Sequence, residues 1–267
     1  MEEQMSAPSE VRRRSSVKGQ NVVLTGGSAG IGRTTAETFV ADGANVTFCS
    51  RDREEIEETA TTINEKDYPG QAHGVKADVT NPADIEHLHE AATDRFGQVD
   101  TLINNVGGAS GSSHLDEMEP DIWKYIIKLN LFSTYYVTRE FANSIKNSGG
   151  SVVNISSFVS QFGVSGMGAY APAKSGINAL TRTLAKEWKS DGVRVNAVSP
   201  GYIATEGLKQ HVGLDRTPPR KEVDRTLGTP AEVADLVRFL ASPAASLVTG
   251  QIVTAMAAPP SVESPFS

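Results

Sequence analysis

The chain has 267 residues, of which 39% are hydrophobic and 21% are charged, a composition typical of a globular protein with a sizeable core. Its net charge of -7 argues against a nucleic-acid partner. No apolar run approaches the roughly 20 residues that cross a bilayer, and the polar N-terminus differs from a secretory signal. We therefore expect no membrane partner and a cytoplasmic location. The single cysteine, Cys49, excludes an internal disulfide, and its apolar surroundings in the sequence predict a buried, inert thiol.

The two ends of the chain differ from its centre in composition. Residues 1–17 are polar and include a basic run at 12–14, so we expect a disordered tail there. One domain is expected over residues 18–258, followed by a short tail at 259–267 that begins with two prolines. The five histidines are scattered and no metal-binding motif accompanies them, so the sequence predicts no metal site.

Between these ends, short apolar runs alternate with helical segments. The expected strands are at 22–25, 45–49, 72–79, 99–107, 152–155, 193–201 and 251–254. Helices are expected up to Ala41, around 54–63, from near Pro82, within 121–146, from Tyr170, and at 230–241. This alternation predicts an α/β class, single-domain Rossmann fold: a doubly wound, mostly parallel seven-stranded sheet with helices on both faces.

A glycine-rich turn lies between the first expected strand and the first expected helix. Glycine lets the backbone approach a pyrophosphate, and a helix N-terminus offers free N–H groups. A tight turn without a ligand is the alternative, but the position after the first strand of a doubly wound pattern favours a dinucleotide. The candidate residues are Gly26, Ser28, Gly30, Ile31 and Gly32.

The end of the second expected strand indicates which dinucleotide is bound. An acidic residue there would bind the ribose 2′-hydroxyl, whereas this chain has Ser50 and Arg51. A guanidinium can pair with a 2′-phosphate, and a serine adds a hydroxyl donor, so the pair favours NADP(H). Asp52 is interpreted as the start of the next helix, because Glu54 and Glu55 follow it.

Tyr170 and Lys174 are four residues apart, a spacing that places two side chains on one face of a helix. An ammonium beside a phenol favours the phenolate, so we expect Lys174 to lower the pKa of Tyr170. Ser157 follows the expected strand at 152–155, and a turn there would bring its hydroxyl alongside. These groups suit acid/base chemistry on a carbonyl or an alcohol, although an ordinary helix face is the alternative for the pair alone.

From Lys18 to about Thr254 the chain resembles the short-chain dehydrogenase/reductase family, with several motifs in the family's order. The resemblance implies that Asp78 and Val79 contact adenine, that Asn105 belongs to the family's Asn-Asn-Ala-Gly segment, and that Pro200, Gly201, Ile203 and Thr205 hold the nicotinamide. It also implies a catalytic set of Asn130, Ser157, Tyr170 and Lys174, a homo-dimer or homo-tetramer, and NADP in members with arginine at the position of Arg51.

In that family, Tyr170 would exchange a proton with the substrate oxygen while hydride moves to or from the nicotinamide. Lys174 would hold the nicotinamide ribose, Ser157 would bind the substrate oxygen, and Asn130 would anchor a water that links Lys174 to solvent.

Three features depart from the family pattern. Pro172 lies between Tyr170 and Lys174, which is tolerated only in a first helical turn, so the helix should begin within about two residues of Tyr170. The chain has Ala255-Met256-Ala257-Ala258 where the family often has Val-Asp-Gly-Gly, which affects the expected subunit contact. Family members that act on acyl carrier protein tend to present basic residues near the site entrance, whereas this chain has Asp191, an acid that we expect to repel an acidic carrier protein, although four basic residues at 216–225 could compensate.

The substrate should be selected by three stretches, 108–118, 158–168 and 202–227, the last containing a mobile lid at about 206–227. The residues expected to face substrate are largely apolar or aromatic and suit a hydrophobic ketone. They are Phe158, Phe162, Met167, Tyr202 and Leu208. The leading hypothesis is an NADP(H)-dependent oxidoreductase that interconverts a ketone or aldehyde and an alcohol. The alternatives are a 3-oxoacyl thioester reductase and a catalytically silent dinucleotide-binding sensor.

Overall fold

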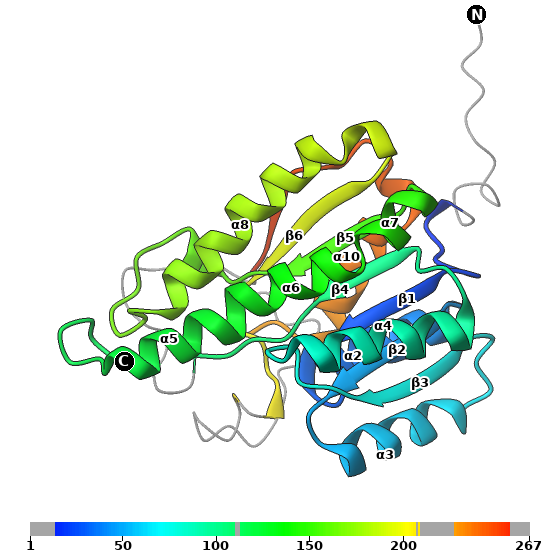
Figure 1. The fold of residues 1–267 in the computed structure, drawn as a ribbon, viewed down its shortest axis with the longest axis horizontal. Helices are drawn as coiled ribbons and strands as arrows, with labels where there is room; N and C mark the ends of the chain where they lie inside the picture. The colour runs from blue at the N-terminus through cyan, green and yellow to red at the C-terminus, as the bar shows by residue number, and fades with distance from the viewer. Residues whose placement is uncertain (1–13, 110–112, 207, 209–226, 257–267) are drawn as a thin grey trace, which may run out of the picture.

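The structure is a computed structural model that describes residues 14–109, 113–206, 208 and 227–256 (Figure 1). Most of the expected N-terminal tail, nearly all of the expected lid with its basic residues, and the expected C-terminal tail at 259–267 lie outside these ranges.

The centre of the molecule is one seven-stranded parallel sheet, as the alternation of apolar and helical segments predicts. Its order is β3-β2-β1-β4-β5-β6-β7. The direction in which successive strands are added reverses between β1 and β4, which opens a crevice at the carboxyl ends of the strands. The strands are β1 (Asn21–Thr25), β2 (Asn45–Ser50), β3 (Gln71–Lys76), β4 (Thr101–Asn104), β5 (Ser151–Ile155), β6 (Arg194–Pro200) and β7 (Ile252–Ala255).

Helices cover both faces of this sheet (Figure 1). On one face lie α2 (Gly30–Ala41), α3 (Arg53–Asn64) and α10 (Pro230–Ala241). On the other lie α4 (Pro82–Phe96), α6 (Ser133–Glu140), α7 (Ala142–Ser148) and α8 (Tyr170–Glu187). The helix α5 (Pro120–Ile127) lies between α4 and α6 in the chain. The layers follow from the period of two in a strand: Val22 and Leu24 pack on the first face, and Val23 packs on the second.

The starts of several helices agree with their sequence signals. Asp52 caps α3 by accepting a hydrogen bond from the Glu55 N–H at 3.0 Å, which confirms its interpretation as a helix start. Pro82 occupies the first turn of α4. The helix α8 begins at Tyr170, so Pro172 falls in the first turn, where its missing N–H leaves no bond unmade. The prediction for the start of that helix is confirmed.

The structure adds detail to two expectations about the chain's course. Val17, assigned to the disordered tail, is fully buried, and its N–H donates to the Asp42 carboxylate at 2.8 Å. The folded domain therefore begins before Lys18. The helical region 121–146 is not one helix, because a π-helical turn, η1 (Lys128–Phe132), separates α5 from α6.

No helix in the described part of the chain is both long and apolar enough to cross a bilayer.

Candidate active site

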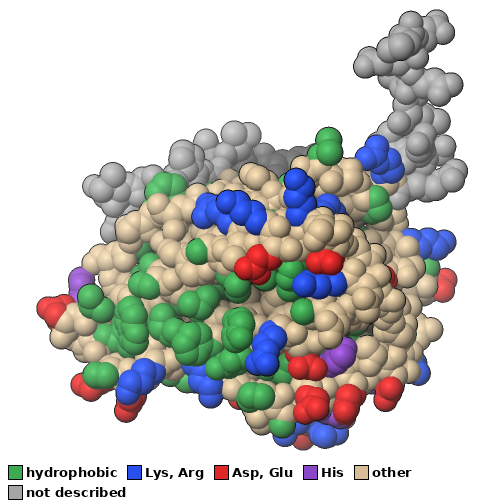
Figure 2. Space-filling view, turned by 45° about the horizontal axis from the view of Figure 1, so that its top comes forward, with side chains coloured by type: hydrophobic (Ala, Val, Ile, Leu, Met, Phe, Trp, Pro, Cys, Tyr) green, Lys and Arg blue, Asp and Glu red, His purple; other side chains and the backbone are tan. Residues whose placement is uncertain are grey.

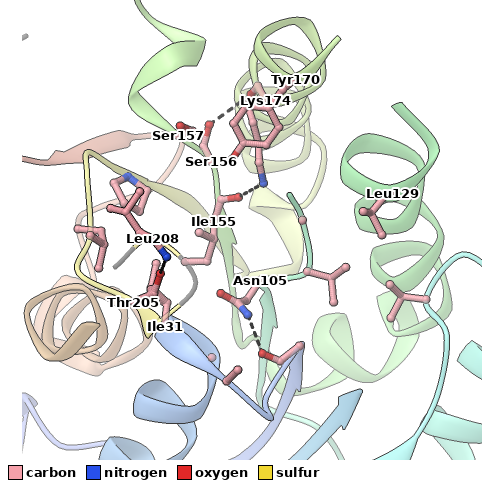
Figure 3. Close-up of a pocket in the computed structure, with 18 of the residues that line it drawn as sticks. Ile31, Asn105, Leu129, Ile155, Ser156, Ser157, Tyr170, Lys174, Thr205 and Leu208 are labelled. Atoms are coloured by element: carbon pink, nitrogen blue, oxygen red, sulfur yellow. Dashed lines mark hydrogen bonds between the residues drawn. The ribbon is translucent and has the colours of Figure 1, made fainter. Parts of the chain in front are cut away.

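A cavity of about 1110 Å³ opens at the carboxyl ends of β1, β4, β5 and β6 (Figure 3). It lies where the strand order reverses, the usual ligand position in open parallel sheets. Residues from the glycine-rich turn line one part of it, and residues from β5, α8 and the segment after β6 line the rest. The volume is large enough for an extended ligand and a second, smaller molecule.

The glycine-rich turn has a shape that only small residues allow. Gly26 has φ of 73°, in the left-handed region, and a Cβ added at Gly32 would lie 1.8 Å from the Gly26 carbonyl oxygen. Asn105, from the segment after β4, fixes the turn from across the crevice. Its side-chain nitrogen donates to the carbonyls of Thr25 and Gly26 at 3.0 and 2.9 Å (Figure 3).

The N-terminus of α2 faces this turn without a competing group. Ala29, at the cap position, makes no side-chain cap bond, and the first turn contains no acidic residue. The first N–H groups of a helix and its positive dipole end favour an anion, so the turn and helix together fit a pyrophosphate.

The end of β2 supplies the polar side chains of the adjoining part of the cavity. Ser50 and Arg51 both line it, and no ion pair to Arg51 occurs among the described residues. Ser50 Oγ donates to the Asp52 carbonyl at 2.9 Å, while Asp52 caps α3. Asp78, after β3, also lines the cavity, and its side chain accepts from the Thr80 N–H at 2.8 Å.

Ser157, Tyr170 and Lys174 meet at the other end of the cavity. The Ser157 side chain is close enough to the Tyr170 hydroxyl for a hydrogen bond that lowers the pKa of the phenol. The ammonium nitrogen of Lys174 lies 5.6 Å from the centroid of the Tyr170 ring and donates to the Ile155 carbonyl at 2.9 Å. The three side chains are held by one strand end and by the first two turns of one helix.

Burial is the largest influence on the pKa values of Tyr170 and Lys174. It raises the pKa of Tyr170 above its ordinary value of 10.0, and the hydrogen bond from Ser157 opposes that change. Burial also lowers the pKa of Lys174 from 10.5 to about 7. The expectation that Lys174 lowers the pKa of Tyr170 is therefore wrong for the protein without its ligands. A lysine with a pKa near 7 is only partly charged at neutral pH, and its charge is not the controlling influence on the phenol.

Asn130 lies in the π-helical turn and does not line the cavity. It is fully buried, and its amide joins the Gly108 backbone twice, accepting from the N–H and donating to the carbonyl, each at 3.0 Å. Gly107 packs against both it and Lys174: an added Cβ would lie 2.5 Å from Asn130 Oδ1 and 2.8 Å from Lys174 Nζ. The structure thus places Asn130 behind the site, fixing the segment after β4.

Of the other expected site residues, two do not line the cavity and the rest do. Gly30 does not line the cavity, although an added Cβ there would meet Thr205 at 3.2 Å. Phe162 points into solvent with 43% of its surface exposed, so the expectation that it faces substrate is wrong. The remaining expected residues line the cavity: Gly26, Ser28, Ile31, Gly32, Ser50, Arg51, Asp78, Val79, Asn105, Ser157, Phe158, Met167, Tyr170, Lys174, Pro200, Gly201, Tyr202, Ile203, Thr205 and Leu208.

Several lining residues had no sequence signal that singled them out. Leu129, Ser156, Val159 and Val164 are examples. Leu129 is in the π-helical turn η1, and it reaches the cavity because the helical pitch changes there. The spacing of apolar residues in the sequence does not predict that change. No group of three or more possible metal ligands occurs within the part of the chain that the structure describes.

The C-terminal strand closes the cavity behind the end of β6. The Gly201 N–H donates to the Ala255 carbonyl at 2.9 Å, and a Cβ at Gly201 would lie 2.8 Å from Met256 Cγ. The altered residues after β7 thus pack directly against the segment expected to hold a nicotinamide.

Asp191 is far from the cavity, which corrects an expectation. It ends the short turn η3 (Lys189–Asp191) shortly before β6 begins at Arg194, at the amino ends of the strands, whereas the cavity is at their carboxyl ends. Its carboxylate pairs with Lys146 at 3.7 Å. It therefore gives no reason to exclude an acidic carrier protein at the site entrance.

Comparisons with known proteins agree with this geometry. A family model described as Enoyl-(Acyl carrier protein) reductase matches residues 26–255. The chain is 36% identical over 242 residues to the 3-oxoacyl-[acyl-carrier-protein] reductase FabG of Vibrio cholerae, covering 88% of this chain and 95% of that protein. It is 36% identical over 253 residues to a tropinone reductase homologue of Arabidopsis thaliana, covering 92% and 93%. A structure of 7α-hydroxysteroid dehydrogenase complexed with NADH and 7-oxo glycochenodeoxycholic acid superimposes with a TM-score of 0.82 at 30% identity, covering 92% of this chain and 96% of that one.

Proposed function

Because this chain belongs to the short-chain dehydrogenase/reductase family and is an oxidoreductase that interconverts a carbonyl and an alcohol, we propose that Tyr170 is its acid/base group, NADP(H) its dinucleotide and a hydrophobic ketone its substrate. The observation that carries the proposal is that Ser157, Tyr170 and Lys174 line one cavity together with the glycine-rich turn.

Each residue of the group has a distinct role in this proposal. In the reducing direction Tyr170 gives its proton to the carbonyl oxygen, which Ser157 also binds, and in the oxidising direction Tyr170 takes a proton from the alcohol. Ser157 fixes the position of the substrate oxygen and stabilises the phenolate by a hydrogen bond. Lys174, with a pKa of about 7, can take up or release a proton near neutral pH beside the phenol. A bound nicotinamide dinucleotide supplies or accepts the hydride.

The residues that would hold the dinucleotide follow the crevice from end to end. The glycine-rich turn and the N-terminus of α2 would bind the pyrophosphate, Asp78 and Val79 the adenine, and the segment from Pro200 to Thr205 the nicotinamide. Asn105 would keep the turn in shape, and Asn130 would anchor a water behind Lys174.

The proposed preference for NADP(H) rests on charge. Arg51 is a guanidinium without an ion pair among the described residues, and the Asp52 side chain already caps α3. That arrangement would attract a 2′-phosphate more than a bare hydroxyl. The replacement Arg51→Ala should weaken NADPH binding about tenfold or more while changing NADH binding little. Arg53→Ala, at an exposed arginine that pairs with Glu57, is the control. Equal weakening of both dinucleotides by Arg51→Ala would reject the preference.

The substrate end of the cavity is apolar. It is lined by Phe158, Val164, Met167, Tyr202 and Leu208. The rings of Phe158 and Tyr202 pack against each other with their centroids 5.0 Å apart. All charged residues lining the described cavity, apart from Lys174, are near the end of β2 or of β3. This supports a ketone without a charge next to the reacting carbon.

A 3-oxoacyl thioester is the second candidate substrate. The likeness to FabG over 95% of that protein's length favours it, and the position of Asp191 removes an objection to an acidic carrier protein. A panel of cyclohexanone, a steroid ketone, tropinone and acetoacetyl-CoA, each assayed with NADPH and with NADH, would separate the two candidates.

The test of the acid/base assignment is Tyr170→Phe, which removes only the hydroxyl. It should lower turnover of any accepted ketone by about 100-fold or more and leave NADPH binding intact. Tyr68→Phe is the matched control, because that hydroxyl bonds Glu37 and does not line the cavity. Turnover that survives Tyr170→Phe would reject the proposal.

We also infer that the protein forms a homo-oligomer through an apolar ridge made by Ile122, Tyr125, Phe132 and Tyr135 on α5, η1 and α6. Each of these side chains is between 39% and 46% exposed. Figure 2 shows hydrophobic side chains gathered on the side of the molecule where α5 lies. Exposed apolar clusters of this kind mark contact surfaces, and closed symmetric pairs are the commonest oligomers. Phe132→Lys should lower the mass measured by light scattering to that of a smaller species. Leu247→Lys, at a more exposed residue outside the ridge, should not.

A further inference from the structure

The hydroxyl of Ser160 joins the turn of the chain that carries Ser157 to the helix α8. It donates to the Ser157 carbonyl at 2.5 Å and accepts from the side-chain nitrogen of Asn178 at 2.7 Å. The hydroxyl of Ser156 lies 3.2 Å from it on the remaining side. The proton of the Ser160 hydroxyl and one of its two lone pairs are thus engaged, and the single proton of Ser156 is within reach of the other lone pair and of the Lys174 carbonyl.

These bonds fasten the short turn η2 (Phe158–Ser160) to the helix α8. Ser175 Oγ also donates to the Ser160 carbonyl at 3.0 Å, and Ser156 Oγ lies within 3.2 Å of the Lys174 carbonyl. On α8, Asn178 is one turn beyond Lys174 and two turns beyond Tyr170. A closed loop of bonds therefore runs from Tyr170 through Ser157 and Ser160 to Asn178 and returns along the helix.

Asn178 is an unusual choice for simple packing. It is 5% exposed, and its side-chain oxygen has no hydrogen-bond partner within the described structure. A buried unpaired oxygen is costly, and an apolar side chain would fill the same position without that cost. Only the amide nitrogen of Asn178 makes a side-chain hydrogen bond, and it donates to the Ser160 hydroxyl.

We propose that Ser160 and Asn178 are a positioning pair that sets the orientation of Ser157 toward Tyr170. The proposal rests on the proposed function of the same site. Asn178 orients the Ser160 hydroxyl, that hydroxyl holds the Ser157 carbonyl, and the Ser157 side chain is thereby directed at the phenol. Neither residue lines the cavity, so neither acts on substrate directly.

The first test reads the phenol itself and requires no substrate. In protein labelled with carbon-13 at tyrosine Cζ, the resonance of Tyr170 is identified by its loss in Tyr170→Phe. We expect Ser160→Ala to move this resonance in the same direction as Ser157→Ala, and Ser160→Thr, which restores a hydroxyl, to return it toward its original position. Ser151→Ala removes a buried hydroxyl at the opposite end of β5, and it should leave the resonance in place.

The second test is kinetic, with whichever ketone of the panel is turned over fastest. Ser160→Ala and Asn178→Leu should each lower kcat about tenfold or more with a smaller change in KM, because a misplaced Ser157 costs orientation rather than binding. The double variant should be no worse than the more impaired single variant, since both act through one carbonyl. In alcohol oxidation, the acid limb of the pH profile should move to higher pH, because a weaker bond from Ser157 raises the pKa of Tyr170.

Several results would overturn the proposal. One is a Tyr170 resonance that Ser157→Ala moves and Ser160→Ala does not. Another is a Tyr170 resonance that Ser157→Ala does not move, which would show that the hydrogen bond from Ser157 to Tyr170 is absent. A third is a loss of kcat in Ser160→Ala that is not restored in Ser160→Thr and that Ser151→Ala reproduces. The failure of the proposed function is a separate outcome, recognised by turnover that survives Tyr170→Phe.

Discussion

Replacing Lys174 by methionine should stabilise the unliganded protein at neutral and acidic pH. The lysine is 2% exposed and makes no ion pair within the described structure, and burial lowers its pKa from 10.5 to about 7. Between those two pH values the unfolded chain binds a proton at this residue that the folded chain does not. The unfolding free energy of the wild-type protein therefore rises with pH across that window.

The magnitude follows from the two pKa values. The interval between 10.5 and about 7 corresponds to about 5 kcal/mol at roughly 1.4 kcal/mol per pH unit, and this full penalty is present below about pH 7. Methionine has a similar length and no charge, but it gives up the hydrogen bond to the Ile155 carbonyl, which costs about 1–3 kcal/mol. The net gain of Lys174→Met should be about 2–4 kcal/mol below about pH 7, and it should change sign between about pH 8 and pH 10.

Urea unfolding of both proteins at several pH values and one fixed protein concentration measures this difference. Lys186→Met, on the exposed side of the same helix, is the control and should show no change of sign. A Lys174→Met protein that is less stable than the wild type at about pH 6, or a difference that does not vary with pH, would refute the reasoning.

Three further predictions concern other parts of the fold. Gly32→Ala should abolish dinucleotide binding, measured by the fluorescence of added NADPH, because its Cβ would lie 1.8 Å from the Gly26 carbonyl oxygen; binding within threefold of the wild type would contradict this. Arg194→Met should lower the unfolding free energy by about 2–4 kcal/mol in urea, since the guanidinium donates to four carbonyls at and beyond the C-terminal end of α10; a change below about 0.5 kcal/mol would be inconsistent with that role. Cys49 is fully buried, and burial raises its pKa to about 12, so a thiol reagent should modify it only in the unfolded protein, and rapid modification of the native chain would contradict the structure.

The fold could be predicted because its signals are local and mutually consistent. Apolar runs separated by helical segments determine a parallel sheet, and the cap at Asp52 and the proline at 172 mark helix starts that the structure confirms. The glycine-rich turn could be predicted because its backbone requires glycine at two positions. Gly26 has a positive φ, and Gly32 lies so close to the Gly26 carbonyl oxygen that a side chain would not fit.

The features that could not be predicted depend on how deeply a side chain is buried and on the end of the strands at which it lies. The direction of the pKa change at Tyr170 is set by how deeply the phenol is enclosed, and no spacing of residues reports that. Phe162 and Asp191 were assigned to the site by their neighbours in sequence, yet one points into solvent and the other lies at the opposite ends of the strands. A residue that directly precedes a parallel strand belongs to the edge away from the ligand, a topological rule that would have placed Asp191 correctly.

The groups that violate the ordinary rules of packing gather on a short part of one helix. Tyr170 is a half-buried phenol, Lys174 a buried amine without a counter-charge in the described structure, and Asn178 a buried amide with an unpaired oxygen, and they are spaced four residues apart along α8. That spacing directs all three toward the turn that carries Ser157. Each would be replaced by an apolar residue if stability alone decided, as the predicted gain for Lys174→Met illustrates. The two apolar clusters on either side of the sheet are what allow the fold to tolerate three such costs along a single face of α8. A helix that concentrates them beside the cavity and behind it is accordingly organised for the chemistry there, and the sheet keeps that helix in place.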